Sequence, residues 1–132
     1  MKYFQFNKLV RDKIVENMKK SGQKTIGVRT LKDKEYLEEL KKKLREETEE
    51  FLNVKDQSKL KEELADIQEV IDYLKKVLKM KDSDFKKFKK EKIEKSGGFD
   101  KRIYLESVGI REDSEWLEYF MKNKDKYPET KI

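Results

Sequence analysis

The chain has 132 residues, of which 47% are charged and 35% are hydrophobic, and its formal net charge is +6. This length suits one domain with a modest core. The chain has no cysteine and no histidine, which excludes disulfides, a zinc site of the usual kind and Ser–His or Cys–His nucleophile pairs. No apolar run approaches the roughly 20 residues of a membrane span, and the first residues lack the apolar region of a signal peptide. We therefore expect a cytoplasmic protein without a membrane partner.

The first predicted helix covers residues 8 to about 20. Asn7 is its candidate N-cap, apolar side chains recur at helical spacing, and the Ser21-Gly22 pair ends it. The following segment, 25–31, alternates apolar and polar residues, which predicts a short strand or an extended loop.

Two long amphipathic helices follow, over residues 33 to about 54 and 58 to about 79, with Ser58 as the predicted cap of the second. The connection between them is short, which implies an antiparallel helical hairpin. Because the apolar fraction is low but arranged in clean stripes, we expect part of the apolar surface to be buried between subunits.

Three more segments complete the chain. A shorter helix begins at Asp82 or Ser83 and runs to about 95, residues 102–108 are extended or irregular and could pair with 25–31, and a last helix covers about 114–124. The expected fold class is therefore all-α, a hairpin-based bundle of about four or five helices that assembles into an oligomer. We predict a single domain over 1–132, with the C-terminal helix and tail at about 111–132.

Four carboxylates on the two long helices carry the chemistry. Glu47 and Glu50 lie on the first helix, and Glu63 and Asp66 lie on the second, each pair at a spacing of i, i+3 that places both members on one side. In a projection at about 100° per residue, Glu47 and Glu63 fall inside the apolar arcs of their helices. A carboxylate aimed at a helix–helix contact is costly unless it is neutralised, so two facing helices with this feature suggest a shared cation.

A cluster built only of Asp and Glu oxygens suits a hard cation, Mg²⁺ or Mn²⁺ as a substitute. Such ions complete their coordination with water and substrate phosphates, which makes phosphate chemistry the leading class. Two plainer interpretations remain open. The carboxylates can belong to a solvated charged face, or they can form structural ion pairs with Lys or Arg.

The motifs resemble a known family. Residues 46–50 (EETEE) and 63–66 (ELAD) are similar to the EExxE…ExxD pattern of the MazG-like all-α nucleoside triphosphate pyrophosphohydrolases. Residues 7–14 (NKLVRDKI) and 95–103 (KSGGFDKRI) resemble the branch of that superfamily described as phosphoribosyl-ATP pyrophosphohydrolase-like. The resemblance covers about residues 5–108.

The resemblance implies that Glu47, Glu50, Glu63 and Asp66 hold Mg²⁺, with Glu46, Glu47 and Glu63 as the catalytic residues. It also implies hydrolysis of a nucleoside triphosphate to the monophosphate and pyrophosphate, as in clearing excess or non-standard nucleotides. Family members assemble as dimers or tetramers. Glu46 matches the first Glu of the pattern, but the projection places it on the far side of its helix, so a partner's helix would have to reach it.

Five cations are candidates for contacts with the nucleotide phosphates, because they lie in or just before the two terminal motif segments. They are Arg11, Lys13, Lys92, Lys101 and Arg102. Ordinary surface charge is the alternative interpretation for each of them.

Two other functions compete with hydrolysis. One is a basic helical module that binds nucleic acid through Lys–phosphate contacts, with structural acidic salt bridges, and the other is a helical interaction protein. Nucleic acid is the less favoured partner, because only five of the 34 basic residues are Arg, the usual reader of base edges. No motif encodes the base and sugar preference, the number of ions or the general base. Nor does any motif distinguish a dimer from a tetramer or assign a role to the last helix with Trp116.

Overall fold

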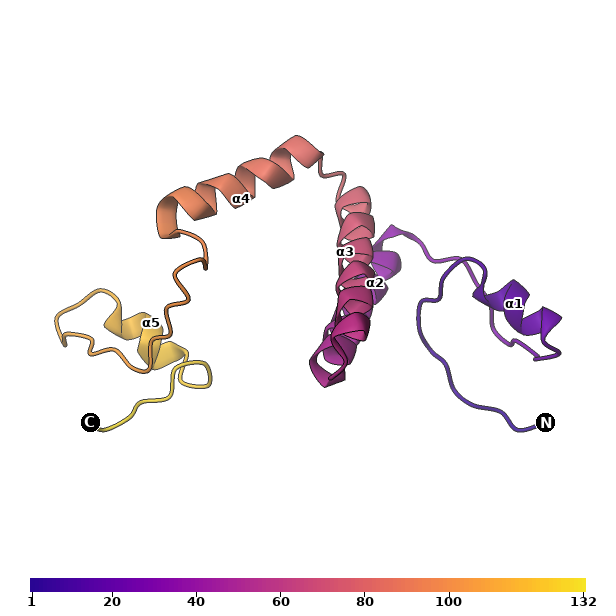
Figure 1. The fold of residues 1–132 in the computed structure, drawn as a ribbon, viewed down its shortest axis with the longest axis horizontal. Coiled ribbons are helices and arrows are strands. Elements are labelled where there is room, and N and C mark those ends of the chain that lie inside the picture. Colours follow the sequence, from indigo (N-terminus) through magenta and orange to yellow (C-terminus); the bar gives the residue numbers. More distant parts are fainter. The chain divides into compact units, whose positions relative to one another are not determined.

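The computed structural model describes residues 1–132 and is entirely helical, which confirms the all-α fold class (Figure 1). The five helices are α1 (Ile14–Lys20), α2 (Asp33–Asn53), α3 (Gln57–Val77), α4 (Asp82–Ser96) and α5 (Leu117–Lys122). None of them is both long enough and apolar enough to cross a membrane. The chain divides into two compact units, residues 1–91 and residues 92–132.

The α2–α3 hairpin is the centre of the first unit, and its two helices run side by side (Figure 1). Each helix has one apolar face, and the two faces meet. The core between them is small, since Leu40 of α2 and Val70 of α3 are the only buried hydrophobic side chains. The hairpin predicted from the apolar stripes and the short connection is therefore present.

Asp56 caps the start of α3. Its carboxylate accepts hydrogen bonds from the backbone N–H and the hydroxyl of Ser58, both at 3.0 Å. The prediction of Ser58 as the cap is wrong by two positions, because Asp56 has the extended backbone (φ −77°, ψ 123°) that an N-cap needs. Ser58 already lies within the first turn.

The first helix is shorter than predicted, and the prediction of Asn7 as its cap is wrong. The helix begins at Ile14, and Asn7 adopts a left-handed backbone with φ 43°. The residues between them are instead held to the hairpin by ion pairs, of Lys8 with α2 and of Arg11 with α3. These tertiary contacts outweigh the local helical preference. We call residues 8–13 the N-terminal segment.

The possible β pairing of residues 25–31 with residues 102–108 is not formed, because neither segment is a strand. The local backbone gives a physical reason. Gly27 has φ 71° and Arg102 has φ 55°, and a left-handed residue interrupts the extended conformation that a ladder needs. The extended-loop alternative for both segments is the correct one.

In the second unit, α5 supports a small group of aromatic side chains. It begins at Leu117 rather than at about 114, because the Ser114 hydroxyl accepts a hydrogen bond from the N–H of Trp116 and forms a turn there. The ring of Phe120 lies 4.9 Å from that of Tyr127 and 5.6 Å from that of Tyr119, centroid to centroid. These ring contacts fold the C-terminal tail back on α5.

Candidate metal centre

Three of the four predicted carboxylates converge in the hairpin. Glu47 and Glu50 come from α2 and Glu63 comes from α3, and one oxygen of each lies within 4.8 Å of the other two. The short turn brings the end of α2 opposite the start of α3, and the spacing of three residues places both α2 carboxylates on one side. We call these three residues the acidic cluster.

Two oxygens of the acidic cluster are buried without a partner. Glu47 is only 7% exposed, and its Oε2 atom accepts no hydrogen bond, nor does the buried Oε2 atom of Glu63. The nearest cation to Glu47 is Lys43, whose Nζ lies 3.9 Å from the other oxygen, Oε1. Because buried polar atoms are nearly always hydrogen-bonded in folded proteins, these two unpartnered oxygens are unusual and call for an explanation.

The pKa shifts in the acidic cluster also favour a bound cation. Burial, followed by the negative charge of Glu50, raises the pKa of Glu47 from its ordinary value of 4.5 to about 7. Burial also raises the pKa of Glu63, with further contributions from the charges of Glu50 and Asp66. Like charges held together in a partly dry site favour protonation, whereas a bound cation favours the ionised form.

The donor set fits a hard divalent cation. All three side chains offer carboxylate oxygens, which Mg²⁺ and Mn²⁺ prefer, and neither histidine nor cysteine is available in the chain. Glu50 is exposed, so this side of the acidic cluster is open to water or a substrate. Mg²⁺ commonly binds through few carboxylates and completes its octahedron with water and phosphate oxygens.

Asp66, the fourth predicted ligand, is paired with a cation of the protein. Its Oδ1 accepts a hydrogen bond from Arg11 Nη2 at 3.2 Å, and Arg11 Nη1 lies 2.6 Å from Oε2 of Glu69. Asp66 is near enough for its charge to raise the pKa of Glu47 and Glu63. Arg11, predicted to contact phosphate, thus lies beside the acidic cluster, and the hydrogen bond that it donates to Glu69 contributes most to raising the pKa of Arg11.

Glu46 lies outside the acidic cluster, as its projection indicates. Its carboxylate binds Lys8 Nζ at 3.1 Å and Lys43 Nζ at 3.4 Å. Burial opposes its ionisation, but the hydrogen bond from Lys8 and the charge of Lys43 outweigh it and hold the pKa of Glu46 below its ordinary value. Within one chain, Glu46 therefore holds the N-terminal segment and Lys43 in place.

The remaining phosphate-binding candidates are exposed side chains that belong to two different units of the chain. Lys13 is exposed just before α1. Lys92, Lys101 and Arg102 belong to the second unit, and they too are exposed. The role of these four cations stays a prediction.

Sequence reasoning missed three residues that form ion pairs with predicted site residues: Lys8 with Glu46, Lys43 with Glu46 and Glu47, and Glu69 with Arg11. A signal existed for two of them. Lys43 precedes Glu47 by four residues, and Glu69 follows Asp66 by three, so each shares a helix side with a predicted ligand. Lys8 approaches through tertiary contact alone, and no local spacing reveals it.

Comparison of the chain with protein-family models, with curated proteins and with solved structures found no match. What the acidic cluster can do is therefore inferred from its own residues. Three carboxylates within reach of one ion, beside Lys43 and Arg11, are chemically suited to a divalent cation and an anionic ligand.

Proposed function

We propose that Glu47, Glu50 and Glu63 hold Mg²⁺, with Mn²⁺ as a substitute, and that the protein hydrolyses a nucleoside triphosphate to the monophosphate and pyrophosphate. The observation that carries this proposal is the pair of buried, unpartnered oxygens on Glu47 and Glu63, at the meeting point of two helices. A phosphate chain is the partner that such an ion most often takes in enzymes.

Each group has a task in this reaction. Mg²⁺ held by Glu47, Glu50 and Glu63 would offset charge on the phosphoryl oxygens and would make water a better nucleophile. Water attacks the α-phosphorus, the bond from that phosphorus to the bridging oxygen breaks, pyrophosphate leaves, and the proton passes to solvent or to a carboxylate. Lys43 and Arg11 lie beside the acidic cluster, where a point charge and a planar guanidinium can bind phosphate oxygens. Asp66 joins the ligands if Arg11 turns from it to the substrate.

We infer that the active protein is a homodimer or homotetramer in the cytoplasm. Leucines on the hairpin leave much of their surface uncovered, since Leu52 is 71% exposed, Leu64 is 52% exposed and Leu78 is 53% exposed. A second copy that covers them would add to the small core of Leu40 and Val70.

The rival interpretation is a basic nucleic-acid-binding module in which the acidic side chains are structural ion pairs. Asp66 and Glu46 fit it, because both are paired with cations. The Oε2 atoms of Glu47 and Glu63 do not fit it, because no cation or hydrogen-bond donor reaches them. That module would show a steep salt dependence of nucleic-acid affinity and no turnover.

One assay tests the proposed reaction. The protein is incubated with a panel of NTPs and dNTPs plus Mg²⁺, and pyrophosphate release is measured with and without EDTA. We expect turnover that EDTA abolishes and that Glu63→Gln lowers by about 100-fold or more. The matched control is Glu62→Gln, an exposed neighbour on α3, which should retain activity. Normal turnover by the Glu63→Gln variant would refute the assignment.

A further inference from the structure

A cavity of about 200 Å³ lies between the N-terminal segment and the hairpin, and residues 9–12 form one of its walls. Leu40 and Val70, the two buried hydrophobic residues, line it from α2 and α3. Arg11 and Asp12 line it as exposed residues. The cavity thus has buried apolar side chains at Leu40 and Val70 and exposed charged side chains at Arg11 and Asp12.

The cavity and the acidic cluster share a residue. Glu47 lines the cavity and is also the buried member of the acidic cluster. Lys43, 3.9 Å from the Glu47 carboxylate, lines the cavity as well. Whatever fills this space therefore lies next to the groups proposed to hold the ion.

The size of the cavity limits what it can hold. Sites that enclose a complete drug-sized ligand measure about 300–1,000 Å³. At about 200 Å³ this cavity admits one ring system, with the rest of the molecule left outside. A nucleotide fits this description, because its flat base could fill the cavity while its charged phosphate chain extends outside to the metal.

The lining matches a flat heterocycle with polar edges. Tyr36 and Tyr73 supply aromatic surface on α2 and α3. Burial, followed by the charges of Tyr73 and Asp12, raises the pKa of Tyr36, so the two hydroxyls and the carboxylate lie within electrostatic reach of one another. Hydroxyls and a carboxylate can pair with the N–H groups and ring nitrogens of a base, which an alkyl chain does not offer.

We propose that this cavity binds the base of the nucleotide substrate, a planar nitrogen heterocycle, while the triphosphate extends past Glu47 to the acidic cluster. The inference rests on the proposed function, since it assumes a nucleotide at that cluster. The N-terminal segment then acts as one wall of the substrate site, fastened by Arg11 to Asp66 and Glu69.

The test separates binding of the base from binding of the phosphates. Calorimetric titration with Mg²⁺ compares an α,β-methylene nucleoside triphosphate, which carries a base and resists hydrolysis, with inorganic tripolyphosphate, which carries none. The wild-type protein is measured beside Tyr73→Ala, which removes an exposed aromatic side chain of the lining, and Val70→Phe, which fills the cavity. Tyr3→Ala is the matched control, because Tyr3 is 63% exposed and does not line the cavity.

We expect the analogue to bind more tightly than tripolyphosphate. Tyr73→Ala should weaken binding of the analogue by roughly 10-fold, because one aromatic side chain that stacks on the base is lost. The affinity for tripolyphosphate should not change. Val70→Phe, if it folds, should do the same, and Tyr3→Ala should change neither affinity.

Two results would overturn the inference, and they are distinguishable. If the analogue binds no better than tripolyphosphate, or if Tyr73→Ala leaves its affinity unchanged, the base does not lie in this cavity although the acidic cluster still binds phosphate. If neither ligand binds with Mg²⁺ present, the proposed function fails and the inference fails with it.

Discussion

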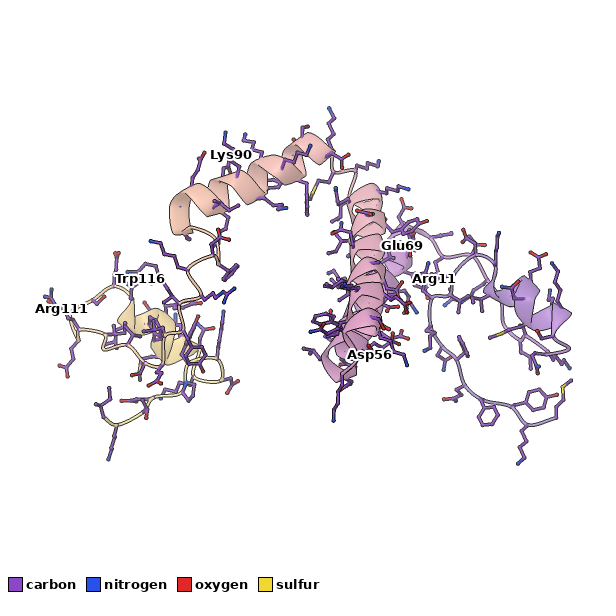
Figure 2. All side chains as sticks on the ribbon, viewed as in Figure 1. Arg11, Asp56, Glu69, Lys90, Arg111 and Trp116 are labelled. Atoms are coloured by element: carbon purple, nitrogen blue, oxygen red, sulfur yellow. The ribbon has the colours of Figure 1, made fainter.

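Arg11 and Asp66 lie 55 positions apart in the sequence and share a hydrogen bond of 3.2 Å. Figure 2 shows Arg11 reaching toward Glu69 on α3, with which it forms a second ion pair at 2.6 Å. The contact fastens the N-terminal segment to the hairpin. It also pairs the fourth predicted carboxylate with a cation at 3.2 Å, whereas Glu47 has only Lys43 at 3.9 Å.

The first prediction concerns this contact. Arg11→Gln should increase amide hydrogen exchange over residues 8–13, because the N-terminal segment loses its ion pairs to α3. The free energy of unfolding should change by less than about 1 kcal/mol, since the pair is half exposed. The control is Lys13→Gln, an exposed cation for which no ion pair is recorded. Exchange that stays as slow as in the wild type would show that the ion pairs do not hold the segment.

The second prediction is a pH dependence of the metal-free protein. The pKa of Glu47 rises from 4.5 to about 7 on folding, so between these values the folded state binds more protons than the unfolded state. The free energy of unfolding should therefore fall as the pH rises through this window. Urea unfolding in the presence of EDTA, at a series of pH values, measures this free energy. Glu47→Gln should flatten the slope, and an equal slope in this variant would contradict the assignment.

The third prediction concerns the turn of the hairpin. Asp56→Ala should destabilise the protein by about 1 kcal/mol, because the first N–H groups of α3 lose their acceptor. Asp56→Asn should retain most of the stability, since an amide oxygen accepts the same bond. Urea unfolding followed by circular dichroism checks both variants. Equal stability of Asp56→Ala and the wild type would show that the cap contributes nothing.

The fourth prediction tests the proposed assembly. Sedimentation should show a dimer or tetramer that Leu64→Lys shifts toward the monomer, because a charge would enter the apolar contact between copies. Leu64 is 52% exposed in the single chain, so the variant should keep its helical content. Glu62→Lys is the control, because Glu62 is exposed and its spacing of two residues from Leu64 places it on a different side of α3. If the wild-type protein stayed monomeric at all concentrations, the proposed dimer or tetramer would be wrong.

The hairpin and the acidic cluster were predictable because their determinants are local. Apolar spacing set the helices, whose observed bounds Asp33–Asn53 and Gln57–Val77 lie within about two residues of those predicted. A short turn and a spacing of three residues then placed Glu47, Glu50 and Glu63 together. Helical periodicity carries this information directly.

The errors share a different cause, which is contact between residues distant in sequence. The predicted cap at Asn7 failed because Lys8 and Arg11 bind the hairpin, and no periodicity encodes that. The same contacts form one wall of the cavity, so the cavity could not be predicted from the sequence. Of the two alternatives for residues 25–31, the strand did not form, because a strand needs a partner and Gly27 has a left-handed backbone.

Manganese binding tests the central claim most directly, because it needs no knowledge of the substrate. Titration with Mn²⁺, followed by loss of the free-ion electron paramagnetic resonance signal, should show saturable binding that excess Mg²⁺ displaces. Glu47→Gln and Glu63→Gln should weaken it by about 10-fold or more, while Glu49→Gln, an exposed neighbour on α2, should match the wild type. Absence of Mn²⁺ binding in the wild type, or equal binding in all four proteins, would contradict the account.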